Sequence, residues 1–261
     1  MISSLKIKLF FIGALLFTLS CDGELDSLVN ERLENNPAPD TTANAGSADF
    51  SNFITIGNSL TAGFMDAALY DIGQNNSLGA QIAAQLAPAG APGTFNQPDI
   101  DSERGFNTSV DPNPDNLGRF KLDINIPGPS PTIEGDPIGD FSDDVSLDNY
   151  AVPGILLGQL LTPATGGTQT SPLFNPFYQR FASDPGSSTI LGDAVASEPT
   201  FFTLWIGNND VLAYALSGAT QDQLLTDTQL FQQQFGEVIN TLMTETSASG
   251  VVGTIPPVLG I

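Results

Sequence analysis

Three short turns in this sequence place a hydroxyl, amides and glycines directly after runs typical of strands. Gly57-Asn58-Ser59 follows the apolar run at residues 53–56, and Gly207-Asn208-Asn209-Asp210 follows the apolar run at 201–206. Between them, the stretch 149–152 leads into Pro153-Gly154. A run of this kind that ends in a glycine-containing turn is typical of a buried strand reaching a loop.

These three turns hold the groups that acyl transfer requires. Ser59 carries a hydroxyl that can attack a carbonyl carbon. Hydrogen-bond donors about 3 Å from the developing oxyanion would stabilise it, and the backbone amides of Ser59 and Gly154 with the side-chain amide of Asn209 are candidates. In open α/β sheets ligands bind beyond the carboxyl ends of the strands, where we expect all three turns to lie.

Composition excludes several function classes. The chain has 29 acidic and 7 basic residues, a net charge of −22, and no histidine. Nucleic acid is not an expected partner, because phosphate binding needs clustered lysine and arginine. A serine–histidine mechanism must take its base from outside the printed chain, since no imidazole is present. We predict no metal site and no cofactor.

The N-terminus has the pattern of an export signal. Lys6 and Lys8 precede an apolar stretch at 9–19, which is short for a membrane span and ends at Cys21, the single cysteine. The region 1–21 resembles a bacterial lipoprotein signal with a relaxed lipobox, in which Cys21 is acylated. We therefore expect an exported protein anchored in the bacterial outer membrane, with 22–49 as a flexible tether.

Residues 22–24, Asp-Gly-Glu, resemble the acidic tract that follows the acylated cysteine in surface-exposed lipoproteins. This likeness would place the protein at the cell surface.

The remaining chain, 50–261, reads as one α/β domain with a mainly parallel sheet. A helix is expected over 76–86, capped by Asn76 or Ser77. A second helix is expected to begin near Thr220, whose spacing to Gln223 matches a capping box. The run at 201–206 predicts a strand covered on both faces, and 251–255 predicts another strand.

Residues 88–148 are rich in Pro, Gly, Asp and Asn and are predicted to form a long insertion. The stretch 111–118 begins like a calcium loop but has Asn116 where that loop needs glycine, so an EF-hand is rejected. The acidic group Asp136, Asp140, Asp143 and Asp144 fits either a loose calcium site or a solvated loop. The aromatic residues at 174–181 either line a groove or fix a loop to the core.

Taken in order, the three turns resemble the blocks of the SGNH/GDSL hydrolase family. Gly57-Asn58-Ser59-Leu60 is similar to the GDSL block, Gly154 belongs to the second block, and Gly207–Asp210 is similar to the G-x-N-D block. The resemblance covers residues 53–261. It implies a flavodoxin-like three-layer sandwich and an esterase or lipase that acts on small-molecule, glycan or lipid esters. Ser59 would be the nucleophile, with Ser59, Gly154 and Asn209 forming the oxyanion hole.

Two departures accompany the resemblance. Asn58 stands where the family has aspartate, and the C-terminal Asp-x-x-His block is absent. We expect this block beyond residue 261, as part of a missing C-terminal segment, so that the printed chain is nearly inactive. The alternative is a non-catalytic cell-surface protein that uses the same scaffold to bind a glycan or a lipid.

Overall fold

The computed structural model describes residues 43–107, 118–122, 124–125, 128, 134–141 and 145–256. By compactness the chain divides into the units Met1–Ala43 and Asn44–Ile261, and every helix and strand given below belongs to the second. The expected signal at 1–21 with Cys21 lies outside the described residues. Among the residues that the structure describes, no helix has both the length and the apolar content to cross a membrane.

The second unit is a mixed α/β fold built on a small parallel sheet. Strands β1 (Phe53–Gly57), β2 (Phe201–Trp205) and β3 (Ser249–Val252) lie side by side in the order β1-β2-β3. Thr55 pairs with Thr203, which in turn pairs with Val251. The expected strands at 53–56 and 201–206 are therefore confirmed. The third, expected at 251–255, begins two residues and ends three residues earlier than expected.

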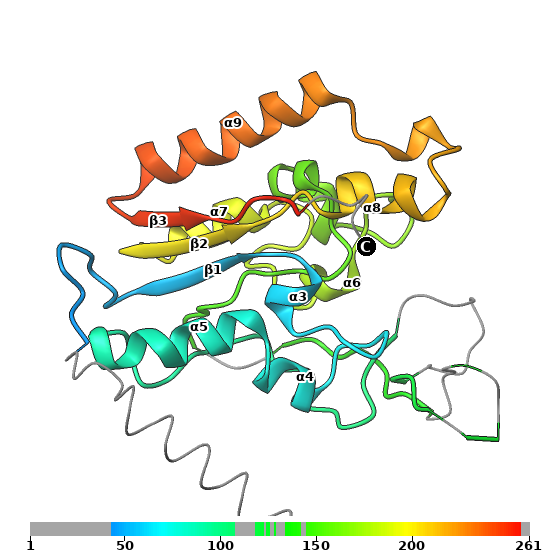
Figure 1. The fold of residues 1–261 in the computed structure, drawn as a ribbon, viewed down its shortest axis with the longest axis horizontal. Coiled ribbons are helices and arrows are strands. Elements are labelled where there is room, and N and C mark those ends of the chain that lie inside the picture. Colours follow the sequence, from blue (N-terminus) through cyan, green and yellow to red (C-terminus); the bar gives the residue numbers. More distant parts are fainter. Residues whose placement is uncertain are drawn as a thin grey trace, which may run out of the picture. The chain divides into compact units, whose positions relative to one another are not determined.

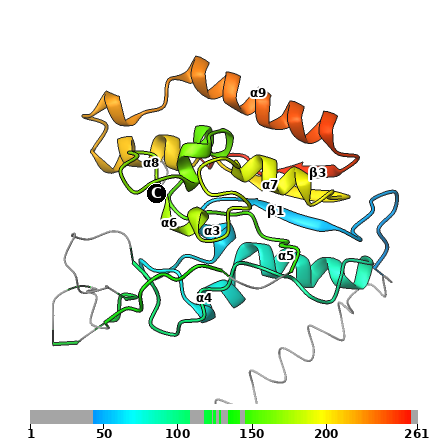
Figure 2. The same cartoon turned by 180° about the vertical axis from the view of Figure 1, so that it is seen from behind.

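Helices flank this sheet. In both views the strands lie between α5 on one side and α9 on the other (Figures 1 and 2). The α-helices are α3 (Ser59–Ala62), α4 (Asp71–Asn75), α5 (Leu78–Leu86), α6 (Pro176–Gln179), α7 (Ile190–Ala196), α8 (Asn209–Leu216) and α9 (Thr228–Glu245). Short 3-10 helices occur at η1 (Ala87–Ala89), η2 (Leu157–Leu161), η3 (Pro163–Gly166) and η4 (Asp222–Leu224).

The helix caps show where local sequence decided the structure. The Ser77 side chain accepts a hydrogen bond from the Ala80 N–H at 3.0 Å, which confirms the cap predicted for α5. The start expected for α9 near Thr220 is wrong. Asp227 caps this helix instead, with its Oδ1 3.0 Å from the N–H groups of both Gln229 and Leu230. A carboxylate that accepts two N–H groups satisfies more of the first turn than a threonine does.

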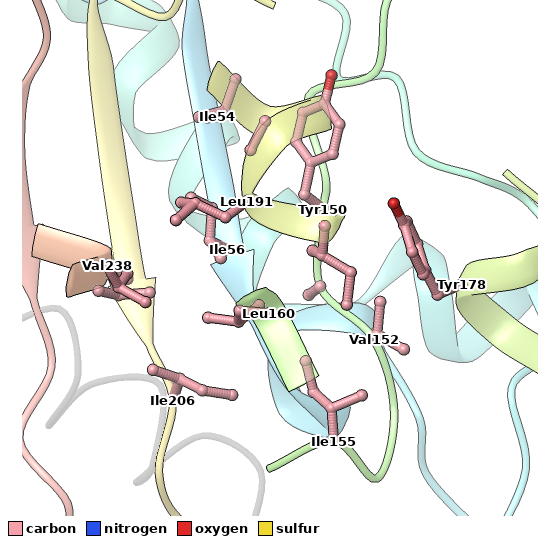
Figure 3. Packing of buried hydrophobic residues seen from close by; sticks show 14 of the residues in the cluster. Ile54, Ile56, Tyr150, Val152, Ile155, Leu160, Tyr178, Leu191, Ile206 and Val238 are labelled. Carbon is pink, nitrogen blue, oxygen red and sulfur yellow. The ribbon is translucent and has the colours of Figure 1, made fainter. Parts of the chain in front are cut away.

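The apolar core lies on one face of the sheet. Ile54 and Ile56 of β1 belong to one buried cluster with Leu160 of η2, Leu191 of α7 and Val238 of α9 (Figure 3). β1 is buried on both faces, since Phe53, Thr55 and Gly57 are buried as well.

β2 does not match the expected coverage on both faces. Phe202 and Leu204 are buried, but Phe201, Thr203 and Trp205 are only partly buried, because less of the chain packs on their side of the sheet. All four residues of β3 are exposed.

Arg180 fixes the described part of the predicted insertion to the domain. It is 7% exposed, and its guanidinium donates to the carbonyl oxygens of Gly139 at 2.9 Å, Pro98 at 2.6 Å and Asp99 at 2.6 Å. Within 174–181, Phe177 and Tyr178 are buried in the core, so these two aromatic rings fix the loop rather than line a groove.

The calcium-like stretch 111–118 lies outside the described residues except for Gly118. Of the acidic group, Asp143 and Asp144 lie outside them too. The described residues hold no cluster of three His, Cys, Asp or Glu side chains arranged for a metal.

Candidate active site

The turn after β1 brings Ser59 to the carboxyl end of the sheet. Gly57 has to be glycine, because a Cβ there would lie 2.5 Å from the Thr61 Oγ1 and 2.8 Å from the Trp205 carbonyl oxygen. Ser59 begins α3 and is partly exposed. The Ala62 N–H donates to the Asn58 carbonyl at 2.9 Å, and the Phe64 N–H donates to the Ser59 carbonyl at 2.8 Å. These bonds hold the serine at the first position of the helix.

Several hydrogen-bond donors around Ser59 have no acceptor within the described residues. The first N–H groups of a helix have no partner in the helix itself, and the Asn58 side chain does not cap those of Ser59, Leu60 and Thr61. The Asn58 Nδ2 is also buried without a hydrogen bond, in a residue that is 2% exposed. Buried donors without partners are rare, because each costs free energy comparable to a lost hydrogen bond. Such a group of donors suits an oxyanion.

The second turn lies next to the first through backbone pairing. The Tyr150 N–H donates to the Thr55 carbonyl at 2.8 Å and the Val152 N–H to the Gly57 carbonyl at 3.0 Å, so this segment runs beside β1 in parallel. Gly154 therefore leaves the same end of the sheet as Ser59. It is exposed, has a φ of +80°, and no atom lies within 4 Å of the position where a Cβ would stand. Its N–H has no acceptor among the described residues.

Asn149 links the first two turns and is 1% exposed. Its Nδ2 donates to the Thr61 carbonyl at 3.1 Å, and its Oδ1 accepts from the Thr55 hydroxyl at 3.0 Å and the Ala151 N–H at 3.1 Å. Sequence reasoning placed Asn149 at the start of the stretch that leads to Gly154 but missed this positioning role. The sequence signal was an amide side chain at the start of a strand-like segment. This signal is weak, because the amide's hydrogen-bond partners depend on which strand lies next to the segment.

The third turn is joined to the second by two side chains. The Asn209 Nδ2 donates to the Ile155 carbonyl at 2.8 Å. The Asp210 Oδ2 accepts from the Leu157 N–H at 2.9 Å, and its Oδ1 accepts from the Thr226 hydroxyl at 2.8 Å. Asn209 and Asp210 thus fix the segment that directly follows Gly154. The Asn209 amide carries two hydrogens, so one donor is left after the bond to Ile155.

A cavity of about 330 Å³ opens beside Ser59. Its polar lining consists of Ser59 with the three asparagines Asn58, Asn208 and Asn209, and the Asn208 Oδ1 is buried without a partner within the described residues. Its apolar walls are Leu60, Trp205, Leu212, Ile255 and Pro256. The structure therefore brings Ser59 and Asn209 into one cavity, whereas Gly154 is not part of the lining. No carboxylate or amine among the described residues lines it, so the lining offers no general base.

Asp210 gives the site a testable pH dependence. Burial raises the pKa of its carboxyl above the ordinary value of 3.8, opposed by the hydrogen bonds from Leu157 and Thr226. The folded state then binds this proton more tightly than the unfolded state. The contribution of Asp210 to stability is therefore full below pH 3.8 and is lost as the pH rises through the raised pKa.

Asp210→Asn is expected to lower the free energy of unfolding by about 1–3 kcal/mol at acidic pH, because an amide nitrogen cannot accept the second hydrogen bond. The deficit should shrink as the pH rises, since only the wild-type side chain has to ionise. Urea unfolding of both proteins from pH 3 upward measures the difference. A deficit that stays constant with pH would show that this carboxyl does not carry the predicted shift.

The fold and the site together define an α/β domain with a serine-containing turn, two further turns and a cavity at the carboxyl end of a parallel sheet. Comparison of the chain with protein-family models found no match, and comparisons with curated proteins and with solved structures found none either. The functional conclusion therefore depends on the geometry of the site and on the three sequence blocks.

Proposed function

We propose that the protein is an exported, lipid-anchored serine ester hydrolase of the SGNH/GDSL type, with the flavodoxin-like sandwich of that family. The observation that carries the proposal is the set of donors without acceptors next to Ser59, at the polar end of a cavity with apolar walls. A site built to bind an oxyanion needs such donors. Uncapped N–H groups occur at the start of any helix, but a buried side-chain donor without a partner, such as the Asn58 Nδ2, is rare.

The proposed reaction begins when the Ser59 Oγ attacks the ester carbonyl carbon and its proton passes to a base. The carbonyl oxygen becomes an oxyanion that accepts hydrogen bonds from the Ser59 N–H, the Gly154 N–H and the Asn209 side chain. The bond between carbon and alcohol oxygen then breaks, and the alcohol leaves with the proton. Water attacks the resulting acyl-serine and restores the hydroxyl.

The base in this proposal is a histidine that an aspartate orients. Because the 261 residues contain no histidine, it has to come from outside them. Asn149, Asn209 and Asp210 act as positioning residues for the turns, through the hydrogen bonds described above.

A fluorophosphonate probe tests the nucleophile directly. With imidazole added as an external base, the probe is expected to modify Ser59 in the folded protein and not after unfolding in urea. Peptide mass spectrometry identifies the modified residue. A folded protein in which Ser59 stays unmodified, while a known serine hydrolase in the same tube reacts, would refute the proposal.

Anchoring through Cys21 is a separate part of the proposal and rests on the N-terminal pattern. In the native host, a Cys21→Ser variant should leave the outer-membrane fraction. Retention there would show that another segment holds the protein at the membrane.

A second candidate function is non-catalytic binding of a glycan or a lipid. It is favoured by the absence of histidine and by a second cavity, also about 330 Å³, whose lining includes the neutral side chains of Gln159, Thr162 and Gln234. Binding of a sugar that survives Ser59→Ala, without ester hydrolysis, would support this candidate. A glycan and lipid screen with no binding above background would remove it.

A further inference from the structure

Exposed leucines gather around the two cavities. We use the name leucine surface for the six exposed residues Leu156, Leu173, Leu212, Leu216, Leu225 and Leu230. Leu216 is the most exposed of them, at 78%. Singly scattered leucines are ordinary on a protein surface, but a continuous group of them marks an interaction site.

The linings of the two cavities place four of the six leucines around the start of α8. Leu212 lines the cavity beside Ser59, and Leu156, Leu173 and Leu230 line the second cavity. Asn209 lines the cavity beside Ser59, and the next residue, Asp210, lines the second cavity. The first turn of α8 therefore separates the two cavities.

The last two leucines lie next to these. Leu216 is one turn beyond Leu212 on the same face of α8. Leu225 directly follows η4. The next residue, Thr226, donates its N–H to the Asp210 carbonyl at 3.1 Å, which ties this segment to the start of the same helix. α8 stands at the carboxyl end of the sheet in Figure 1.

The segments that carry this surface are almost free of charge. Residues 149–179 contain no Asp, Glu, Lys or Arg, and 209–236 contain only Asp210, Asp222 and Asp227. Asp210 is 1% exposed. The Asp227 carboxylate is already engaged as the cap of α9. This is unusual in a chain with a net charge of −22. An anionic partner would be repelled by the rest of the protein and would find no basic residue on these segments.

We propose that the leucine surface docks the protein on an aggregate of lipids without net charge, such as a zwitterionic bilayer or micelle. Leucines that enter the boundary between headgroups and acyl chains leave water without the need for basic residues. When the leucine surface faces the lipid, the cavity beside Ser59 faces it as well, because Leu212 belongs to both. The inference does not depend on Ser59 being a nucleophile.

Trp205 provides a local reporter, because it lines the cavity and is the single tryptophan of the chain. The full chain carrying Cys21→Ser, so that no acyl chain is attached, is titrated with phosphatidylcholine vesicles. Trp205 emission is expected to shift to shorter wavelength. Binding through the N-terminal apolar stretch alone would leave that emission unchanged.

Two double variants test whether vesicle binding requires the leucine surface or only exposed apolar side chains anywhere on the protein. Leu216→Ser with Leu225→Ser is expected to weaken vesicle partitioning about tenfold or more, since both side chains would enter the lipid. The control, Ile72→Ser with Met243→Ser, alters two side chains that are each 58% exposed but lie elsewhere. It should bind like the parent protein.

The lipid composition gives an independent readout. Replacing part of the phosphatidylcholine by phosphatidylglycerol should weaken binding at low salt, because the chain is strongly acidic. Ser59→Ala should leave vesicle binding unchanged even if it abolishes probe labelling, which separates this inference from the proposed hydrolase.

Three outcomes would overturn the inference. The first is a folded parent protein that leaves the Trp205 emission unchanged with vesicles. The second is equal weakening by the two double variants. The third is a dimer, detected by analytical ultracentrifugation, that forms through the leucine surface in a protein that binds no vesicles.

Discussion

Replacing Ser59 by alanine is expected to abolish imidazole-stimulated hydrolysis of a p-nitrophenyl ester by this protein. The chain has no histidine, and in serine hydrolases with a complete triad the loss of that residue alone costs about 10⁶-fold in turnover. The unaided chain should therefore be close to the uncatalysed rate. Imidazole can diffuse to Ser59 because that side chain is partly exposed beside an open cavity.

General-base assistance typically contributes 10²–10⁴-fold, so a stimulation of about 10²-fold at saturating imidazole is the expected scale. Imidazole also cleaves the ester by itself, and Ser59→Ala measures this background in the same buffer. Ser249→Ala serves as the matched control, because Ser249 is exposed on β3 and lies away from the cavity. Stimulation that persists in Ser59→Ala would mean that Ser59 is not the attacking group.

The local parts of this site were predictable from the sequence. An apolar run that ends in Gly-Asn-Ser requires only neighbouring residues to form a strand and a turn, and β1 begins and ends close to where the pattern placed it. The Ser77 cap of α5 is equally local, since its hydrogen bond spans three residues. Patterns of this range are decided by backbone sterics and by single hydrogen bonds.

The connections between the turns were not predictable in the same way. Asn149 bonds to Thr61, and Asp210 to Leu157, across separations of 88 and 53 residues. Which side chain meets which carbonyl depends on the strand order and register, and the sequence does not state these.

The one-sided burial of β2 has a similar cause. Its run 201–206 is apolar throughout, but burial depends on which elements cover Phe201 and Trp205. The capping pattern at Thr220 failed because Ser217 and Gly218 end α8 there, and the Thr220 hydroxyl donates to the Ser217 carbonyl at 2.7 Å.

Gly63→Ala is expected to lower the free energy of unfolding by about 2–5 kcal/mol. Gly63 ends α3 with a φ of +84°, a left-handed conformation that costs alanine about 1–2 kcal/mol. An added Cβ would also lie 2.4 Å from the Gly73 carbonyl oxygen and 2.7 Å from the Gln74 Cα. Both are backbone atoms of α4, so relief requires α3 and α4 to separate, at a further cost of about 1–3 kcal/mol.

Gly154→Ala is the matched control for that experiment. Its φ is +80°, close to that of Gly63, but no atom lies within 4 Å of the added Cβ. The expected loss is therefore only the conformational part, about 1–2 kcal/mol. Denaturant unfolding of the two variants and the parent protein measures both losses. The m-values should be equal, so that a shift of the midpoint reports a change in stability.

The difference between the two losses isolates the contact between α3 and α4, because the backbone conformation is nearly the same at both glycines. Ser59 lies only four residues before Gly63, so a displaced α3 should also move the serine out of its turn. Gly63→Ala is accordingly expected to lose fluorophosphonate labelling under conditions where it remains folded. Equal losses of stability in the two variants would instead mean that α3 is not held in place by α4. The position of Ser59 would then depend on the hydrogen bonds that the carbonyls of Asn58, Ser59 and Thr61 accept.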